Sequence, residues 1–462
     1  MDLDGVSQTG LAVLAESRVP HDQNARAPFM TTVHCRSRIL RRGALYASIL
    51  TVACGSQEVT RPTFDGDVRV GVLHSRTGTL AVSENTVAEA ELLAIREINE
   101  SGGLEIDGRH LRVVALEEDG QSSPDVFAAR LRRMIDRDRV SVVFGGWTSS
   151  SRKAMLPVLE ARDHLLFYPV QFEGEECSNK VFYAGSTPNQ QVAPAVEWLV
   201  QNHGDQFVLA GSDYVYPRTA NRIIRNQLEV LGGDVAGEFY IELGSTDVAS
   251  LVEGIRRSLP DGGVIINTIN GDSNLHFFRE LRDAGLTRSA GYVVMSFSLA
   301  EEEVSAIGAE IMEGTYTSWS FYQSMTTESA RDFNTRFHSA YGAHRVTSDP
   351  AATGYSMVHL WAEAAKKAGS VDPVDVRAAL PGTTVTGPLG TLVALGNHHL
   401  LKDAFLGEVQ QDGQFRIVHS VESVPPDPWS QWLPENRGYS CDWSLSRDDA
   451  ARFRVDRSSE GL

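Results

Sequence analysis

Short β-branched runs alternate with longer amphipathic segments from residue 67 to residue 298 of this 462-residue chain. The run VRVGVLHS at 68–75 is rich in valine and leucine, which is typical of a strand covered on both faces. The segment at 84–100 carries an apolar helical face and stops at a pair of glycines. Because parallel neighbours in a sheet need a crossover helix between them, this alternation predicts parallel sheets packed between helices.

The alternation falls into two successive runs of strands. The expected strands are 68–75, 111–117, 140–146, 164–170 and 180–185, then 206–212, 237–243, 263–270 and 292–298. After them we expect a strand at 313–324, helices at 329–341 and 352–368, and a hairpin near 390–417. Two such runs predict an α/β protein with two doubly wound parallel-sheet lobes, in which ligands bind at the carboxyl ends of the strands.

The N-terminal region carries the features of an export signal. Four arginines within 36–42 precede the apolar run ALYASILTVA, which leads into Cys54. This pattern is typical of a secretory signal over 30–53, and the run is shorter than the roughly 20 residues that a membrane-spanning helix needs. TVAC resembles the lipobox of bacterial lipoproteins, although Thr51 stands where leucine is usual, so Cys54 is predicted to carry a lipid anchor on the extracytoplasmic face. A buried apolar segment is the alternative, and residues 1–29 could be an over-assigned start.

Charge and cysteine content limit the partners and the cross-links. The formal net charge of −18 argues against binding to nucleic acid and to anionic membrane surfaces, because both repel an acidic protein. Beyond Cys54, only Cys177 and Cys441 remain. An even pair in an exported protein is a candidate disulfide, and two free buried thiols are the alternative.

Enzyme signatures are absent from the sequence. It contains no GxSxG, HExxH, GxxxxGK[ST], GxGxxG or CxxC motif. His398 and His399 are adjacent but lack a third ligand in sequence, which is typical of surface histidines, so we predict no metal and no cofactor. The chain is therefore interpreted as a binding protein rather than an enzyme.

Three strand-to-helix turns carry groups suited to a small ligand. In GGWTSSSRK at 145–153, Ser149 lies at the mouth of a helix, where backbone N–H groups lack partners, and simple N-capping is the alternative role. In SDYVYPRTAN at 212–221, Tyr214 and Tyr216 are expected to face one way on an extended segment before a helix that Pro217 begins, although such a pair alone more often serves core packing. In INGDSN at 269–274, Asp272 could accept from a ligand or only cap a helix.

A fourth segment, LLFYPVQFEGEECSN at 165–179, leads from an apolar strand into an aromatic and acidic loop. Tyr168 and one glutamate are expected to line a polar pocket, and the other glutamates are expected to form a solvated rim.

Several of these strings, in the same order, resemble one known family. GGWTSSSRKAMLPV, LLFYPVQFEGEECSN, STPNQQVAPAV, SDYVYPRTANRI, NTINGDSNLHFF and NHHL look like the substrate-binding proteins of urea ABC transporters and, less closely, the amide sensors of amidase operons. The resemblance covers about 68–436 and implies the type I periplasmic-binding fold, with two lobes, three crossings and closure by a hinge around the ligand. It implies lobe one at 67–188 with 318–383, lobe two at 189–317 with 384–437, and a tail at 438–462.

The resemblance also implies roles for single residues. Trp147 and Tyr168 would be aromatic walls, and Ser149 with its neighbouring amides would hold a carbonyl oxygen. A second group would reach in from lobe two: Tyr214, Tyr216 and Asp272. The loop positions of two further residues suggest ligand contact: Gln171 and Glu173.

Urea offers one carbonyl oxygen and four N–H bonds, whereas acetamide offers two N–H bonds and a methyl group, so acceptor-rich sites favour urea. Carboxylates accept and do not donate, so the acidic loop and Asp272 favour urea over a short-chain amide. The expected function is the extracytoplasmic substrate-binding component of an ABC importer, which delivers urea or a small amide to a membrane permease. An amide-sensing regulatory protein is the alternative interpretation, and an amide hydrolase is the third.

Overall fold

The computed structural model describes residues 62–443 and 453–454. The expected early start, the signal segment and Cys54 therefore lie outside the described residues. Within the described residues the chain is an α/β protein with two sheets, which confirms the expected fold class. No helix in this part of the chain is long and apolar enough to cross a membrane.

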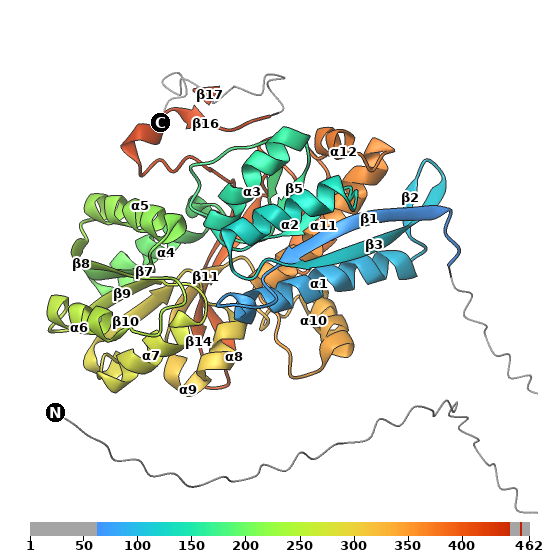
Figure 1. The fold of residues 1–462 in the computed structure, drawn as a ribbon. Helices are drawn as coiled ribbons and strands as arrows, with labels where there is room; N and C mark the ends of the chain where they lie inside the picture. The colour runs from blue at the N-terminus through green and yellow to red at the C-terminus, as the bar shows by residue number, and fades with distance from the viewer. Residues whose placement is uncertain (1–61, 444–452, 455–462) are drawn as a thin grey trace, which may run out of the picture. The chain divides into compact units, whose positions relative to one another are not determined.

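The first sheet has six strands in the order β2-β3-β1-β4-β5-β6. All neighbours are parallel except the β2–β3 pair, which is antiparallel. The strands are β1 (Gly66–His74), β2 (Leu104–Ile106), β3 (Arg109–Asp119), β4 (Val143–Gly145), β5 (Leu166–Tyr168) and β6 (Val181–Tyr183). In Figure 1 the helices α1, α10 and α11 cover one face of this sheet and α2 and α3 cover the other, and each face has its own apolar core.

The second sheet has seven strands in the order β15-β14-β11-β10-β9-β7-β8. Strands β11, β10, β9, β7 and β8 are parallel to one another. Strands β14 and β15 extend the sheet beyond β11 in antiparallel orientation. The strands are β7 (Gln206–Ser212), β8 (Asp234–Ile241), β9 (Gly263–Thr268), β10 (Tyr292–Ser296), β11 (Tyr316–Trp319), β14 (Lys402–Val409) and β15 (Phe415–Val424). Apolar side chains of α6, α7 and α8 pack on one face, and those of α4 and α5 pack on the other.

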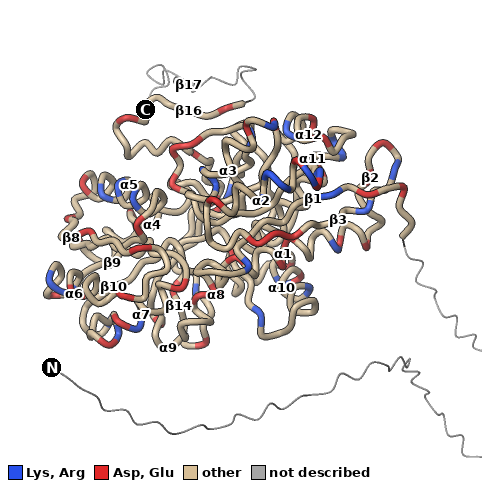
Figure 2. Tube along the Cα trace, viewed as in Figure 1, with Lys and Arg blue, Asp and Glu red and all other residues tan. Residues whose placement is uncertain are grey.

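The helices follow the strands as the alternating pattern predicts. They are α1 (Ala81–Glu100), α2 (Pro124–Asp136), α3 (Ser149–Arg162), α4 (Pro188–His203), α5 (Val215–Leu231), α6 (Ala249–Ser258), α7 (Ser273–Asp283), α8 (Glu301–Ile307), α9 (Ala309–Met312), α10 (Glu328–Tyr341), α11 (Asp349–Ala368) and α12 (Pro373–Ala379), with short 3-10 turns at Arg288–Ala290 and Pro434–Asn436. Acidic and basic residues are interspersed along their outer turns (Figure 2), as is usual for helices with one buried face.

The chain passes between the two sheets three times within the described residues. It passes from β6 to α4, from β11 to α10, and from the hairpin of β12 (Thr384–Gly387) and β13 (Gly390–Val393) to β14. The predicted boundaries assign this hairpin to lobe two, whereas in the structure it packs against α10 and α11 beside the first sheet. The other lobe boundaries stay predictions. After β15 a disulfide joins Cys441 of the C-terminal segment to Cys177 in the loop between β5 and β6.

The start of α5 differs from the expectation. The helix begins at Val215, so Tyr216 lies in its first turn instead of on an extended segment, and only Tyr214 keeps extended dihedrals. Proline is tolerated in the first turn because its missing N–H has no intrahelical partner there, so Pro217 does not have to begin the helix. The two tyrosine rings still lie side by side, with centroids 6.4 Å apart.

Candidate ligand-binding site

The turn from β4 into α3 is shaped by two glycines. Gly145 and Gly146 both have positive φ, and a Cβ at Gly146 would lie 3.3 Å from the ring of Tyr168. Side chains are excluded there, so the backbone can approach that ring closely. At the helix mouth the side chain of Thr148 accepts a hydrogen bond from the N–H of Ser151 at 3.1 Å. Thr148 therefore caps α3, which leaves the hydroxyl of Ser149 available for another role.

That hydroxyl donates to the carboxylate of Glu173 in the acidic loop. Both residues are buried, with 1% of each residue's surface exposed. Arg152 lies one turn further along α3, and its Nη1 donates to Ser149 Oγ at 3.1 Å while its Nη2 donates to Glu173 Oε1 at 3.3 Å. The three side chains form one polar cluster at the carboxyl ends of β4 and β5.

Tyr168 and Trp147 form an aromatic wall beside this cluster. The hydroxyl of Tyr168 donates to the backbone carbonyl of Trp147, and burial raises the pKa of that phenol, which therefore stays neutral. The indole Nε1 of Trp147 reaches Asn270 Oδ1 at 3.4 Å, in the turn that follows β9 of the second sheet. Trp147 thus connects the two sheets.

A second connection between the two sheets is made by hydrogen bonds to the backbone carbonyl of Phe297, just after β10. Gln171 Nε2 donates to this carbonyl at 2.8 Å, and the hydroxyl of Tyr216 donates to it at 3.4 Å. Burial raises the pKa of Tyr214, whose ring lies beside that of Tyr216 with centroids 6.4 Å apart. The structure therefore brings together seven of the eight predicted ligand-binding residues: Trp147, Ser149, Tyr168, Gln171, Glu173, Tyr214 and Tyr216.

Asp272 is the predicted residue that the structure does not bring to this cluster. It is exposed, its carboxylate accepts from the hydroxyl of Thr79, and its backbone N–H donates to the Thr79 carbonyl at 3.1 Å. It makes no side-chain cap on α7 either. Asn270, two positions earlier in the same INGDSN segment, is a buried polar residue that bonds Trp147 and that the sequence motifs did not single out.

The acidic loop is less solvated than the sequence suggested. Only 7% of Glu176 is exposed, and it accepts from Arg152 Nε and Lys153 Nζ, each at 2.9 Å, and from the hydroxyl of Tyr183 at 2.8 Å. Although burial opposes ionisation, the charges of Arg152 and Lys153 hold the pKa of Glu176 at about 2. The expectation that the other glutamates form a solvated rim is therefore wrong for Glu176, because two cations compensate its burial.

The adjacent histidines are also buried, which corrects the expectation of a surface pair. His399 stacks on Tyr183 with ring centroids 4.7 Å apart and on Phe172 at 5.7 Å. Burial lowers the pKa of His398 to about 3 and that of His399 to about 4, so both are neutral packing residues. Among the described residues, no group of three or more His, Cys, Asp or Glu side chains is arranged to hold a metal ion.

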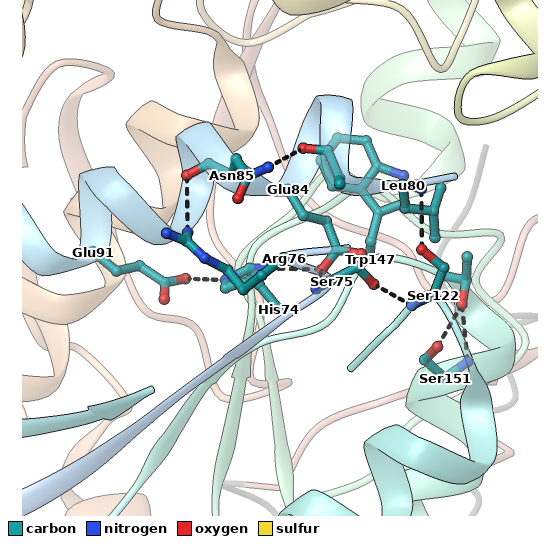
Figure 3. A network of polar contacts seen from close by, with 12 residues as sticks. His74, Ser75, Arg76, Leu80, Glu84, Asn85, Glu91, Ser122, Trp147 and Ser151 are labelled. Carbon is teal, nitrogen blue, oxygen red and sulfur yellow. Dashed lines mark hydrogen bonds and ion pairs between the residues drawn. The ribbon is translucent and has the colours of Figure 1, made fainter. Parts of the chain in front are cut away.

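A charged network around His74 lies next to the turn after β4, where a Cβ on Gly145 would lie 3.2 Å from His74 Nε2. Figure 3 shows this network together with Trp147. His74, at the end of β1, is fully buried and contacts Glu84 through Nδ1 and Glu91 through Nε2, each at 3.0 Å. Glu84 also accepts from the N–H of Ser75 at 2.8 Å. Burial opposes the charge on the imidazole, but the two carboxylates outweigh it and raise the pKa of His74 to about 9. This network fixes the first residues after β1 against α1.

The disulfide fixes the acidic loop from its other end. Cys177 follows Glu176 directly and is bonded to Cys441, with Cα atoms 6.1 Å apart. The loop that carries Glu173 and Glu176 is thereby tied to the C-terminal segment as well as to α3.

A search of curated proteins finds a relative that matches over a short stretch only. Residues of this chain are 31% identical over 123 positions to a protein named limonene hydroxylase from Geobacillus stearothermophilus. The match covers 26% of this chain and 23% of that protein, so the chain spans about a quarter of the length of that relative.

Solved structures match over most of the chain. A periplasmic binding protein from Burkholderia mallei superposes with a TM-score of 0.69 at 18% identity, covering 77% of this chain and 95% of that one. An ABC-transporter solute-binding protein from R. palustris, in complex with 4-hydroxybenzoate, gives 0.68 at 20% identity over 78% and 98%. A branched-chain amino acid ABC-transporter ligand-binding protein from Burkholderia xenovorans gives 0.65 at 21% identity over 77% and 96%.

These similarities agree with the two sheets and three crossings seen in this chain, and they support the expected fold. A family model described as a periplasmic binding protein domain matches residues 68–435, which include both sheets and every residue of the candidate site. The chain therefore belongs to the periplasmic binding protein family.

Proposed function

We propose that this protein is the solute-binding component of an ABC importer and that it binds a small uncharged solute, urea or a short-chain amide, between its two sheets. The family is extracytoplasmic, and its solute-binding role implies a small-molecule ligand and a membrane permease as partners. Two of the similar structures are ABC-transporter binding proteins by their names, which supports the importer role. Lipid anchoring through Cys54 stays a prediction.

The main support for an uncharged solute is that the charged groups beside Ser149, which are Arg152, Glu173 and Glu176, are already paired with one another. The buried cation there, Arg152, already makes hydrogen bonds to Ser149, Glu173 and Glu176. The similar structures whose names mention hydroxybenzoate and branched-chain amino acids concern solutes with a carboxylate, which needs a cation or several free donors. Here the buried Arg152 is already paired with Glu173 and Glu176 and is not free to pair with such an anion, so the site favours a neutral solute.

Hydrogen-bonding capacity supports urea or an amide within that class. The backbone N–H groups at the start of α3, beginning with that of Ser149, are donors suited to a carbonyl oxygen, whereas the hydroxyl hydrogen of Ser149 is already donated to Glu173. Glu173 is an acceptor for solute N–H groups, and Gln171 Oε1 is a second buried acceptor, without a hydrogen-bond partner in the described chain. Because a buried unpaired polar atom costs about 1–3 kcal/mol, a solute N–H that bonds Gln171 gains that amount.

The proposed ligand set is the seven residues that the structure brings together, with Asn270 in place of Asp272. Asp272 is left out because it is exposed and already bonded to Thr79. The preference for urea over a short-chain amide therefore depends on Glu173, Gln171 and Asn270 as acceptors instead of on Asp272.

Isothermal titration calorimetry on the chain from Gly55 onward tests this proposal. Urea, acetamide, leucine and 4-hydroxybenzoate would be titrated in turn under one buffer condition. We expect binding of urea or acetamide and no binding of the two carboxylates. Binding of leucine or 4-hydroxybenzoate without binding of urea or acetamide would refute the uncharged-solute assignment while leaving the family and the fold intact.

A further inference from the structure

Arg152 is a fully buried cation with no role assigned by the sequence reasoning above. None of its surface is exposed, and its guanidinium carbon lies 4.8 Å from the ring centroid of Phe172, 4.9 Å from that of Tyr168 and 5.9 Å from that of Tyr183. Aromatic faces attract a cation, and the attraction is strongest where water is excluded. The rings of the site's wall therefore hold the guanidinium in one place.

The polar contacts of Arg152 are equally specific. Its Nε and Nη2 donate to Glu176 at 2.9 and 3.4 Å, and its other contacts are to Ser149 and Glu173, the two residues proposed to touch the solute. Lys153, which is part-exposed, adds a second cation, with its Nζ 2.9 Å from Glu176 and 3.7 Å from Glu173. Two buried carboxylates thus face two cations, so the cluster carries no net charge.

We propose that Arg152 is the residue that makes this site select an uncharged solute over a cation of the same shape, by neutralising Glu173 and holding Ser149 in place. The inference rests on the proposed function, because it assumes that the solute contacts Ser149 and Glu173. Urea and guanidinium have nearly the same planar shape but differ in charge, and so do acetamide and acetamidinium. With Arg152 present, a buried cation would lose its hydration without a free carboxylate to replace it.

Replacing Arg152 with glutamine removes one positive charge, so the cluster of Glu173, Glu176 and Lys153 becomes net negative. In Arg152→Gln, Glu173 loses its buried cation and keeps only the part-exposed Lys153 at 3.7 Å, and Ser149 loses a donor that fixes its hydroxyl. We expect the affinity for urea or acetamide to fall roughly tenfold or more, as for loss of a hydrogen bond to a charged group. The affinity for guanidinium or acetamidinium should rise, because two carboxylates then face the single cation of Lys153 and the excess negative charge can pair with a cationic solute.

The experiment is calorimetry with the two neutral and the two cationic solutes, the cations being used far below denaturing concentrations. The double variant Arg152→Gln with Glu173→Gln removes the excess negative charge, so we expect it to lose the gain in cation affinity. Arg162→Gln is the matched control, since it removes an arginine from the same helix that pairs instead with Asp136 at 2.7 Å. The control should keep the wild-type order of affinities.

Arg152→Lys is the second variant in case the glutamine variant does not fold. It keeps the charge but lacks the planar fork, so it should still exclude the cations while binding the neutral solutes more weakly. A lysine variant that binds the cations more tightly than wild type would overturn the proposal. A folded Arg152→Gln variant with an unchanged ratio of neutral to cationic affinity would also overturn it. If the wild-type protein binds neither urea nor acetamide, the proposed function fails first and this inference fails with it.

Discussion

Ser149 on α3 donates its hydroxyl hydrogen to Glu173 in the loop after β5, and both side chains are buried. This bond joins the mouth of a helix, which supplies N–H donors, to a carboxylate, which supplies acceptors. A planar solute with a carbonyl on one side and N–H groups on the other can use both, and the geometry of the pair is set by Arg152 behind them.

Replacing Ser149 with alanine tests this pair directly. The change removes the hydroxyl that donates to Glu173 and accepts from Arg152, so Glu173 is no longer held in place and the affinity for the neutral solute should fall roughly 10- to 100-fold. Ser151→Ala is the matched control, because Ser151 Oγ bonds Thr148 Oγ1 at 2.7 Å within the cap of the same helix. Calorimetry should show near wild-type affinity for the control. Equal losses in both variants would mean that Ser149 acts only through the helix end.

The turn after β9 gives a second comparison, between Asn270 and Asp272. Asn270→Ala removes the acceptor for the Trp147 indole and should weaken solute binding, because the buried indole N–H loses its partner. Asp272→Asn alters an exposed residue bonded to Thr79 and should change affinity much less. Titrations of urea and acetamide into both variants check this order. A larger loss for Asp272→Asn would restore that residue as the discriminating acceptor.

Much of the fold could be predicted because long elements carry many periodic positions. The strand expected at 206–212 is β7 with the same bounds, and the helices expected at 329–341 and 352–368 are α10 and α11 with starts shifted by one to three residues. The short elements α9, α12 and β2 were missed, because a helix of fewer than two turns or a strand of only three residues shows little periodicity.

The candidate site was predictable where the residue type itself points to the role, as for Ser149 at a helix mouth and Tyr168 at a strand end. Arg152 was missed because its partners Glu173 and Glu176 lie 21 and 24 positions away and meet it only in the fold. His399 was misread because burial between aromatic rings has no local sequence signal. Asp272 was misplaced because a residue before a helix can point either into a site or toward a neighbouring loop.

The disulfide between Cys177 and Cys441 should stabilise the exported protein. The two cysteines are 264 positions apart, so the bond closes a long loop and should contribute about 2–4 kcal/mol to the free energy of unfolding. Cys177→Ser, Cys441→Ser and the double variant should lose the same amount, since each removes the same bond. Thermal unfolding of the three variants, with wild type in reductant, checks this. Unequal losses, or alkylation of two thiols in the unreduced wild-type protein, would contradict the cross-link.

The buried His74 should make stability depend on pH above neutrality. Its pKa is raised from an ordinary 6.5 to about 9 by Glu91 and Glu84, against the opposing effect of burial. Below 6.5 the imidazole is charged in both folded and unfolded states, so its stabilising contribution is fully present there and is lost as the pH rises from 6.5 through 9. The thermal midpoint of wild type should therefore fall over this range.

His74→Gln isolates that contribution from other groups. Glu302, whose pKa is raised to about 8 by burial and by Glu303, also lowers stability as the pH rises, so wild type and variant must be compared over the same range. The buried His398 and His399, with pKa values of about 3 and 4, titrate at lower pH and do not interfere. The variant should lose less stability than wild type between pH 6.5 and 9. Parallel curves would show that His74 is neutral in the folded protein.

A crystal structure of the chain from Gly55 onward grown with urea, and a second grown with acetamide, tests the central claim most directly. The account predicts a solute between the two sheets, with its carbonyl oxygen within hydrogen-bonding distance of Ser149 and the α3 N–H groups, and an N–H group facing Glu173. Density for the solute at another place, or a carboxylate solute carried through purification and bound to Arg152 in this site, would contradict it.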